Sequence, residues 1–270
     1  MQALLKAIRG SQSPQQWRAC GLLILCALAF SLMTVCVKHL GGTLPVAEIV
    51  LVRSLISIAI TLVMLRRVRV SPWGQQRGRL LLRGLLGTTA LLCFFEALAR
   101  LPLATATLLQ YTYPTLTALS AWLLLGEPIR RRIGLAVVVG WIGVMLVVQP
   151  EWLGGQAPAI ADLTATADLT ATAVALGLGG ALLTALAYVS VRQLSAREHP
   201  LVIVFYFPLV SVPATLPFLW GQALWPSAEQ WIWLAGVGLF TQLGQIWLTE
   251  GLATLPAARA TSINLSLIHI

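Results

Sequence analysis

Charged residues are scarce in this sequence. Asp, Glu, Lys and Arg make up 10% of the 270 residues, whereas hydrophobic residues make up 58%. Soluble domains contain roughly 25% charged residues, because their surface faces water. A chain with so few charges does not cover a water-facing surface of this size, whereas lipid solvates apolar outer side chains. The composition therefore excludes an ordinary soluble domain and indicates a membrane protein.

The residues that build most metal and enzyme sites are also rare. The histidines are His39, His199 and His269, and none lies at ligand spacing from a carboxylate or a cysteine. The four cysteines fall inside apolar segments, without the pattern of a metal site or a disulfide framework. No Gly-rich phosphate loop with a following Lys is present, so an ATP-driven pump is unsupported. We expect no metal and no cofactor.

The net charge of +9 is the one property that suits a nucleic-acid partner. The basic residues, however, stand in short breaks between apolar runs, which leaves little soluble surface for nucleic acid. We therefore expect the lipid bilayer and a small-molecule substrate as partners, and no nucleic acid. Protons as a coupling ion and a homodimer are left open.

Apolar runs close to the ~20 residues that cross a bilayer recur along the chain. The first follows Lys6, Arg9 and Arg18, as in a signal peptide, but its length favours a retained transmembrane helix. A ninth run begins near Pro256. The eight before it are predicted at Ala19–Val37, Val46–Leu65, Leu80–Leu98, Ala104–Leu125, Ile133–Val148, Ala171–Val191, Leu201–Leu219 and Trp231–Leu248.

The distribution of Lys and Arg predicts the orientation. With the N-terminus in the cytoplasm and one crossing per span, the outside segments contain only Lys38 and Arg100. Arg53 and Arg83 fall within spans, and all other basic residues lie in inside segments. This bias follows the positive-inside rule. We predict a multi-pass protein of the inner membrane with a cytoplasmic N-terminus.

One stretch of sequence recurs at a constant offset. EALARLPLATAT begins at Glu96, and EGLATLPAARAT begins at Glu250, with the Glu, Pro and Thr positions in register. The third span therefore corresponds to the eighth, so each repeat holds five helices. An odd number of crossings inverts the second copy, and inverted repeats are typical of secondary transporters that work by alternating access.

The motifs around this repeat resemble the EamA-type drug/metabolite transporter superfamily. They include VAEIVLVRSL from Val46, RGLLG from Arg83, the stretch from Glu96 to Glu127, and YVSVRQL from Tyr188. The resemblance implies an all-α membrane protein with ten helices in two five-helix EamA repeats. It also implies an exporter of amino acids or related small metabolites. We assign residues 19–148 to the first repeat, 149–170 to an outside loop and 171–270 to an incomplete second repeat.

The end of the chain departs from this pattern. Leu265, Leu267 and Ile268 stand where the repeat predicts Tyr, Tyr and Pro. We expect a chain truncated in helix nine, with a foreign tail after about residue 264, and a natural product that extends roughly 30 residues further to complete two bilayer crossings.

Ionisable residues within or beside the spans are candidates for a role in charge recognition or gating. Arg53 lies deepest and is expected to pair with a carboxylate or an anionic group of the substrate. For Glu48, a solvated charge at the helix end is the alternative interpretation. For Glu96 and Glu250, a structural role at the turn before Leu-Pro is favoured over a proton relay. Lys38 completes this group.

The fourth span contains the main binding candidates, because polar and aromatic residues cluster there in apolar surroundings. Pro114 withholds a backbone donor and so frees a carbonyl, and mixed aromatic and polar side chains suit a mostly apolar pocket. Thr and Gln can equally serve as contacts between helices. The candidates are Gln110, Tyr111, Thr112, Tyr113 and Pro114, with Tyr206, Gln242 and Gln245 in the other half. An intramembrane enzyme and a non-transporting scaffold remain alternatives, although no catalytic cluster is found.

Overall fold

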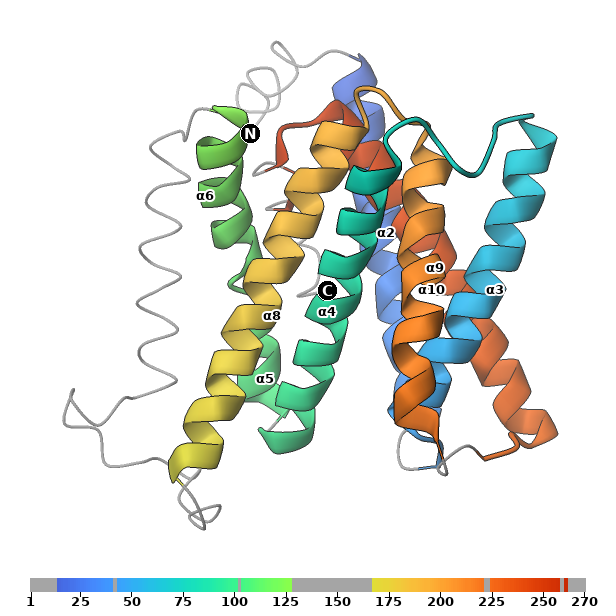
Figure 1. Ribbon diagram of the computed structural model, residues 1–270, viewed down its shortest axis with the longest axis vertical. Coiled ribbons are helices and arrows are strands. Elements are labelled where there is room, and N and C mark those ends of the chain that lie inside the picture. Colours follow the sequence, from blue (N-terminus) through green and yellow to red (C-terminus); the bar gives the residue numbers. More distant parts are fainter. Residues whose placement is uncertain are drawn as a thin grey trace, which may run out of the picture. The chain divides into compact units, whose positions relative to one another are not determined.

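The computed structural model describes residues 14–40, 43–101, 103–127, 167–220, 224–257 and 260–261. Every regular element in these ranges is a helix (Figure 1), as the sequence predicts. The elements are α2 (Pro14–Leu40), α3 (Val46–Arg67), α4 (Arg77–Arg100), α5 (Leu103–Gln110), α6 (Tyr113–Leu125), α8 (Ala167–Leu194), α9 (Pro200–Leu219) and α10 (Ala228–Thr254). The predicted fifth span, most of the outside loop and Leu265–Ile268 lie outside the described residues.

Six helices in this part of the chain are long and apolar enough to cross a membrane. Their apolar faces carry large exposed side chains, such as Leu28 and Leu32 on α2 and Leu55 and Val63 on α3. Hydrocarbon solvates such faces, whereas water does not. The six segments agree with predicted spans to within a few residues and make the chain a multi-pass membrane protein; they are Trp17–Val37, Val46–Arg67, Arg77–Ala97, Ala171–Leu194, Pro200–Leu219 and Ala228–Thr254.

The fourth predicted span, Ala104–Leu125, differs from a single continuous helix. It is divided into α5 and α6 by a turn at Tyr111 and Thr112. The reason is local: Pro114 occupies the first turn of α6, where its missing N–H is tolerated, and the chain restarts a helix there instead of continuing the old one. The sequence predicted a span here, but not the break within it.

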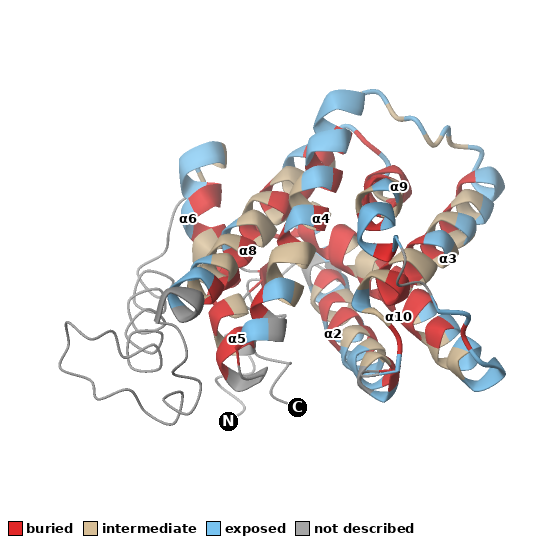
Figure 2. Cartoon of the chain, turned by 60° about the horizontal axis from the view of Figure 1, so that its bottom comes forward, coloured by how far each residue is buried: buried red, intermediate tan, exposed pale blue. Residues whose placement is uncertain are grey.

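The chain forms two compact units. Unit 1 comprises residues 1–84 and 191–270, and unit 2 comprises residues 85–190. In unit 1, α10 packs against α2, α3 and α9, and α3 packs against α9. Helix α9 is the most completely buried of the six apolar helices: 61% of its apolar segment is buried, against 28% of that of α2. Figure 2 shows the buried residues of α9 and α10 in red.

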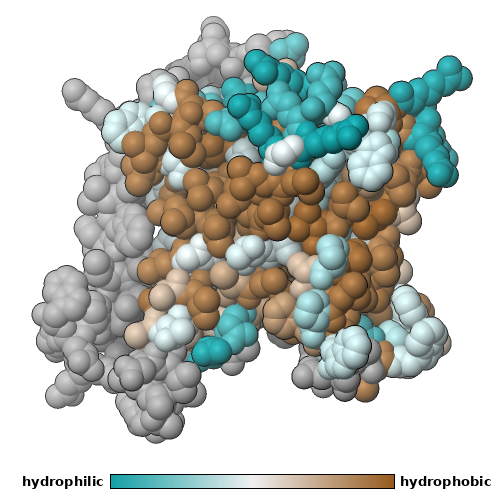
Figure 3. Space-filling view, viewed as in Figure 1, coloured by the Kyte–Doolittle hydropathy of each residue, from teal (hydrophilic) through white to brown (hydrophobic). Residues whose placement is uncertain are grey.

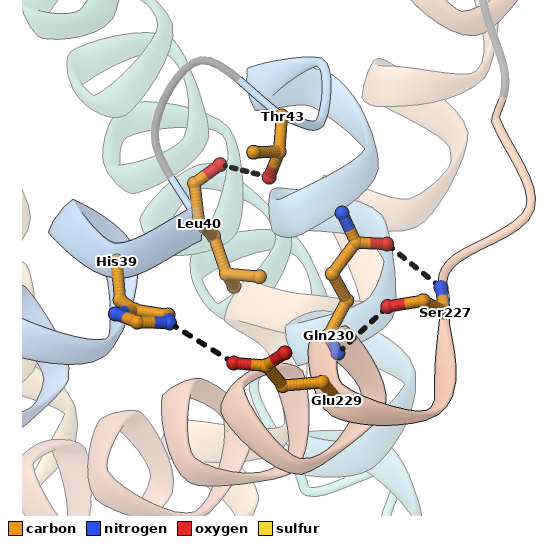
Figure 4. A network of polar contacts seen from close by, with 6 residues as sticks. All are labelled: His39, Leu40, Thr43, Ser227, Glu229 and Gln230. Atoms are coloured by element: carbon orange, nitrogen blue, oxygen red, sulfur yellow. Dashed lines mark hydrogen bonds and ion pairs between the residues drawn. The ribbon is translucent and has the colours of Figure 1, made fainter.

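Side-chain contacts close one end of unit 1, where α2 ends and α3 and α10 begin. His39 Nε2 lies 3.4 Å from Glu229 Oε1, and the His39 ring stacks on Trp233 (Figure 4). Ser227 and Gln230 form a reciprocal capping box at the start of α10. These contacts hold the N-terminus of α10 against the end of α2.

The opposite end of unit 1 is tied together by Glu198. Its Oε1 accepts hydrogen bonds from the backbone N–H groups of Gln75 (2.7 Å) and Gln76 (2.5 Å), which fixes the α3–α4 loop to the start of α9. The Arg192 guanidinium donates to the Ala253 carbonyl oxygen at 2.6 Å, a favourable position for a cation at the C-terminus of α10. Exposed arginines also gather at this end (Figure 3): Arg66, Arg67, Arg69, Arg77 and Arg79.

Close packing of α2 against α10 depends on a small residue. A Cβ atom added at Gly251 would lie 2.6 Å from Leu23 Cδ2, and Leu23 is itself fully buried. Small residues at helix contacts in membranes allow backbones to approach closely. Leu23 therefore fills the space that the missing side chain of Gly251 leaves.

We predict that Gly251→Ala lowers the thermal unfolding midpoint, because the added methyl group overpacks this contact at a cost of about 1–3 kcal/mol. Gly21→Ala on α2 is the matched control, since a Cβ at Gly21 meets nothing within 4 Å. Thermal unfolding of both purified proteins in the same detergent measures the difference. A Gly251→Ala protein as stable as Gly21→Ala would show that the contact is not tight.

Candidate functional site

A polar stripe runs along the buried face of α3. Arg53, Ser57 and Thr61 follow at intervals of four residues, so they lie on one side of the helix. All three are buried, with exposed fractions of 7%, 5% and 0%. Buried ionisable and polar groups in a membrane span mark functional positions by default.

An aromatic ring joins two buried arginines in unit 1. The Arg53 guanidinium carbon lies 5.4 Å from the ring centroid of Phe207, and that of Arg83 lies 5.0 Å from the same centroid. Arg83 is 3% exposed, and its Nη2 donates to Gln245 Oε1 at 3.3 Å. We call Arg53, Phe207 and Arg83 the arginine–phenylalanine cluster; its members come from α3, α9 and α4.

Gly84 brings α4 close enough to α9 for this cluster to form. A Cβ at Gly84 would lie 2.7 Å from the carbonyl oxygen of Tyr206. The absence of a side chain allows the two backbones to approach, and the neighbouring residues Arg83 and Phe207 then meet.

Arg53 has an incomplete set of partners. Its Nε and Nη2 atoms are buried and have no hydrogen-bond partner among the described residues. No described carboxylate lies within 4.0 Å of its guanidinium group. The two buried glutamates of unit 1 bind backbone N–H groups instead: Glu198 those of Gln75 and Gln76, and Glu48 Oε2 that of Leu224 at 3.1 Å. The expected carboxylate partner within the protein is therefore not found in this part of the chain.

Gln242 of α10 contacts the polar stripe of α3, and Gln245 of α10 contacts Arg83. Gln242 is 1% exposed and donates from Nε2 to Thr61 Oγ1 at 2.8 Å, while Gln245 accepts from Arg83. The adjacent Thr241 hydroxyl is buried without a hydrogen-bond partner among the described residues. Of the two glutamines predicted as binding candidates, one thus contacts the stripe that contains Arg53, and the other contacts an arginine of the arginine–phenylalanine cluster.

The predicted cluster of the fourth span lies in unit 2, at the break between α5 and α6. Gln110 donates from Nε2 to Thr184 Oγ1 at 3.1 Å, while its Oε1 is buried without a partner among the described residues. The Tyr113 ring packs edge-on against Tyr188, with centroids 5.5 Å apart. Thr112 and Pro114 are buried, and Tyr111 is partly exposed. These residues stay binding-site predictions.

The remaining candidates lie near helix ends. Tyr206 donates its hydroxyl to the Trp73 carbonyl oxygen at 2.9 Å. Glu96 pairs with Arg100 one turn along α4. Glu48 is 6% exposed, so the interpretation of it as a solvated charge was wrong: the α9–α10 connection covers it. The side chain of Lys38 lies outside the part that the structure describes.

Glu250 lines a pocket of about 530 Å³ at the Glu198 end of unit 1. Arg18 and Leu22 of α2, Pro200 at the start of α9 and Thr254 at the end of α10 also line this pocket. A carboxylate and a guanidinium group therefore face one concave space.

Sequence reasoning did not select Arg83, Phe207, Ser57 or Thr61 as site residues. The spacing of four between Arg53, Ser57 and Thr61 was a readable signal, and so was the position of Arg83 within a span. Phe207 carried no such signal, because phenylalanine is common in apolar helices and its role depends on the packing of α9 against α3.

Comparisons with known proteins show that this chain is similar to transporters. The model of the EamA-like transporter family matches residues 17–149 and 171–268. The pseudopaline exporter of Pseudomonas aeruginosa is 34% identical over 85% of this chain and 76% of its own length. A probable transport protein of Saccharomyces cerevisiae is 29% identical over 79% of this chain and 66% of its own. A solved crystal structure shares the fold with a TM-score of 0.64, 19% identity, and coverage of 94% and 84%.

We predict that Thr61→Val destabilises the protein, because the buried Gln242 amide loses its acceptor at a cost of about 1–3 kcal/mol. The double variant Thr61→Val with Gln242→Leu should recover part of that loss, since both polar partners are then gone. Thr34→Val is the control, because that hydroxyl is exposed on α2. Thermal unfolding in detergent measures all three, and an unaffected Thr61→Val protein would contradict the buried bond.

Proposed function

This chain belongs to the EamA-like transporter family, and we propose that it is a secondary transporter that exports small metabolites by alternating access. The proposed substrates are amino acids or related compounds. The relatives support this proposal, since one of them is an exporter and another is a probable transport protein. The family and these relatives are named as transporters, which disfavours an intramembrane enzyme or a scaffold.

The observation that carries the proposal is the polar set buried in unit 1. Arg53, Ser57 and Thr61 of α3 lie inside an apolar helix, and Gln242 and Gln245 of α10 bond to that helix and to Arg83. Polar groups are retained within membrane spans chiefly where a substrate or an ion binds or passes.

Alternating access is supported by the repeat and by the broken fourth span. The recurrence of the Glu96 segment at Glu250 indicates two inverted halves, and discontinuous helices commonly form the substrate sites of such transporters. We include the α5–α6 break, with Gln110, Tyr111, Thr112, Tyr113 and Pro114, in the proposed substrate path.

We propose that the protein lies in the inner membrane with its N-terminus in the cytoplasm. The arginines at the Glu198 end of unit 1 support this orientation, and the pocket lined by Arg18 and Glu250 then opens to the cytoplasm. The bilayer and the small-molecule substrate are the proposed partners. Proton coupling would act through Glu250, the carboxylate that lines this pocket.

A counterflow assay tests the proposed function. Proteoliposomes of the full-length protein are loaded with unlabelled amino acids and small organic acids, and the uptake of labelled pools is followed with and without a proton gradient. We expect saturable counterflow of at least one pool above that of protein-free liposomes. A folded, reconstituted protein that moves no pool above this background would contradict the proposal.

The orientation has a separate test by cysteine labelling in cells. In a background without the four native cysteines, Ala228→Cys should react with a membrane-impermeant maleimide added outside, because Ala228 is exposed at the start of α10. Arg77→Cys, exposed at the start of α4, should react only after the cells are opened. The reverse pattern would show the opposite orientation.

A further inference from the structure

We propose that the arginine–phenylalanine cluster binds a carboxylate group of the transported metabolite, so that the substrate is a small molecule with a free carboxylate. The inference rests on the proposed transport function and adds the chemical class of the substrate. Arg53 is the residue that takes the carboxylate, and Arg83 and Phe207 complete the site. All three residues belong to unit 1.

The two unpartnered nitrogen atoms of Arg53 identify the chemistry of the ligand. Nε and Nη2 form one edge of the planar guanidinium group, and their N–H bonds point the same way as a fork. Both atoms are buried and have no hydrogen-bond partner among the described residues. Two parallel N–H donors match the two oxygen atoms of a carboxylate. A neutral carbonyl or hydroxyl ligand would use only half of this edge.

The burial of the Arg53 charge also favours an anion. The Arg53 guanidinium is 7% exposed, and the buried glutamates of the same unit bind backbone amides at its two ends. A positive charge taken from water needs a compensating partner. A carboxylate at the free edge of Arg53 supplies that charge when the substrate is bound.

Phe207 explains how the site persists without an anion. Its ring lies within 5.4 Å of both guanidinium carbons, and the negative face of an aromatic ring attracts cations. This attraction is weaker than an ion pair and leaves the hydrogen bonds of the Arg53 Nε and Nη2 edge unmade. The ring therefore offsets part of the cost of burying the cations while no anion is bound.

A lipid headgroup is excluded as the source of the anion by the direction of the side chain. Arg53 is buried, whereas Leu55 and Val63 of the same helix are exposed, so the lipid-facing side of α3 is a different one. A phosphate group offers the same pair of oxygen atoms as a carboxylate, and the experiment separates the two.

Ligand-induced thermal stabilisation of the full-length protein in nanodiscs tests the proposal without requiring transport. The probes are succinate and glutarate, with succinamide and glutaramide as partners that lack any carboxylate and inorganic phosphate as the second anion, all at one ionic strength set with chloride. We expect the carboxylates to raise the unfolding midpoint and the amides not to. Stabilisation by phosphate alone, by the amides equally, or by none of the probes would overturn the carboxylate site.

Variants of Arg53 separate charge from geometry. Arg53→Gln should weaken the apparent affinity for the stabilising carboxylate by roughly 30-fold or more. Arg53→Lys should be nearly as weak, because an ammonium group keeps the charge but lacks the fork. Arg66→Gln on the exposed end of α3 should bind as the unaltered protein does. Unchanged binding by Arg53→Gln, or full retention by Arg53→Lys, would contradict the forked site.

The variant Arg53→Met tests whether Arg53 has a purely structural role. With no anion present, this variant should be at least as thermostable as the unaltered protein, because it removes a buried charge that lacks a full set of partners. A large loss of stability would show that Arg53 holds the fold instead. Because the assay scores binding alone, a protein that binds carboxylates but fails in counterflow would overturn the transport proposal and leave this site standing.

Discussion

Inside a bundle of helices that hydrocarbon surrounds, a polar group has to find its partner within the protein. Most described hydroxyls in the helices do so locally, by donating to the carbonyl oxygen one turn back: Ser54 to Val50, Thr61 to Ser57, and Ser211 to Phe207. The buried carboxylates of unit 1 accept from backbone N–H groups. Against this rule, the buried exceptions at Arg53, Gln110 and Thr241 stand out.

These exceptions share a property that a structural role does not explain. Each lies within a helix or at a helix end that the apolar composition places in the membrane, where an unsatisfied polar group is costly and water is absent. Arg53 and Thr241 belong to unit 1, and Gln110 ends α5 in unit 2. A transported solute that brings its own polar atoms would satisfy such groups intermittently. Transport thus gives a physical reason for leaving them without permanent partners.

Much of the architecture could be predicted from the sequence, because lipid imposes a simple rule on composition. Runs of about 20 apolar residues predicted six helices that the structure contains, from Trp17–Val37 to Ala228–Thr254. The break at Tyr111 and Thr112 was not predicted. Membrane helices often continue through a proline, as α9 does through Pro208, Pro213 and Pro217, and whether a helix continues depends on neighbours that a single sequence does not reveal.

Site residues could be predicted from the sequence only where the type of a single residue is unusual for its surroundings. Arg53 could be selected because a charge in an apolar run is unusual, and Gln242 because it is polar. Phe207 could not, since its role depends on two arginines from other helices that meet at its ring. Glu48 was misjudged in one interpretation because its burial depends on Leu224, which is distant in the chain. Contacts between helices, and not the helices themselves, are what the sequence leaves open.

The two glutamates of the repeat show how equivalent positions come to differ in their surroundings. Glu96 and Glu250 correspond in the sequence, but one turn later the first copy has Arg100 and the second has Thr254. Arg100 engages the carboxylate of Glu96 in an ion pair, whereas Glu250 lines a pocket together with Thr254. Glu96 is therefore engaged within its own helix, whereas Glu250 faces a concave space at one end of unit 1.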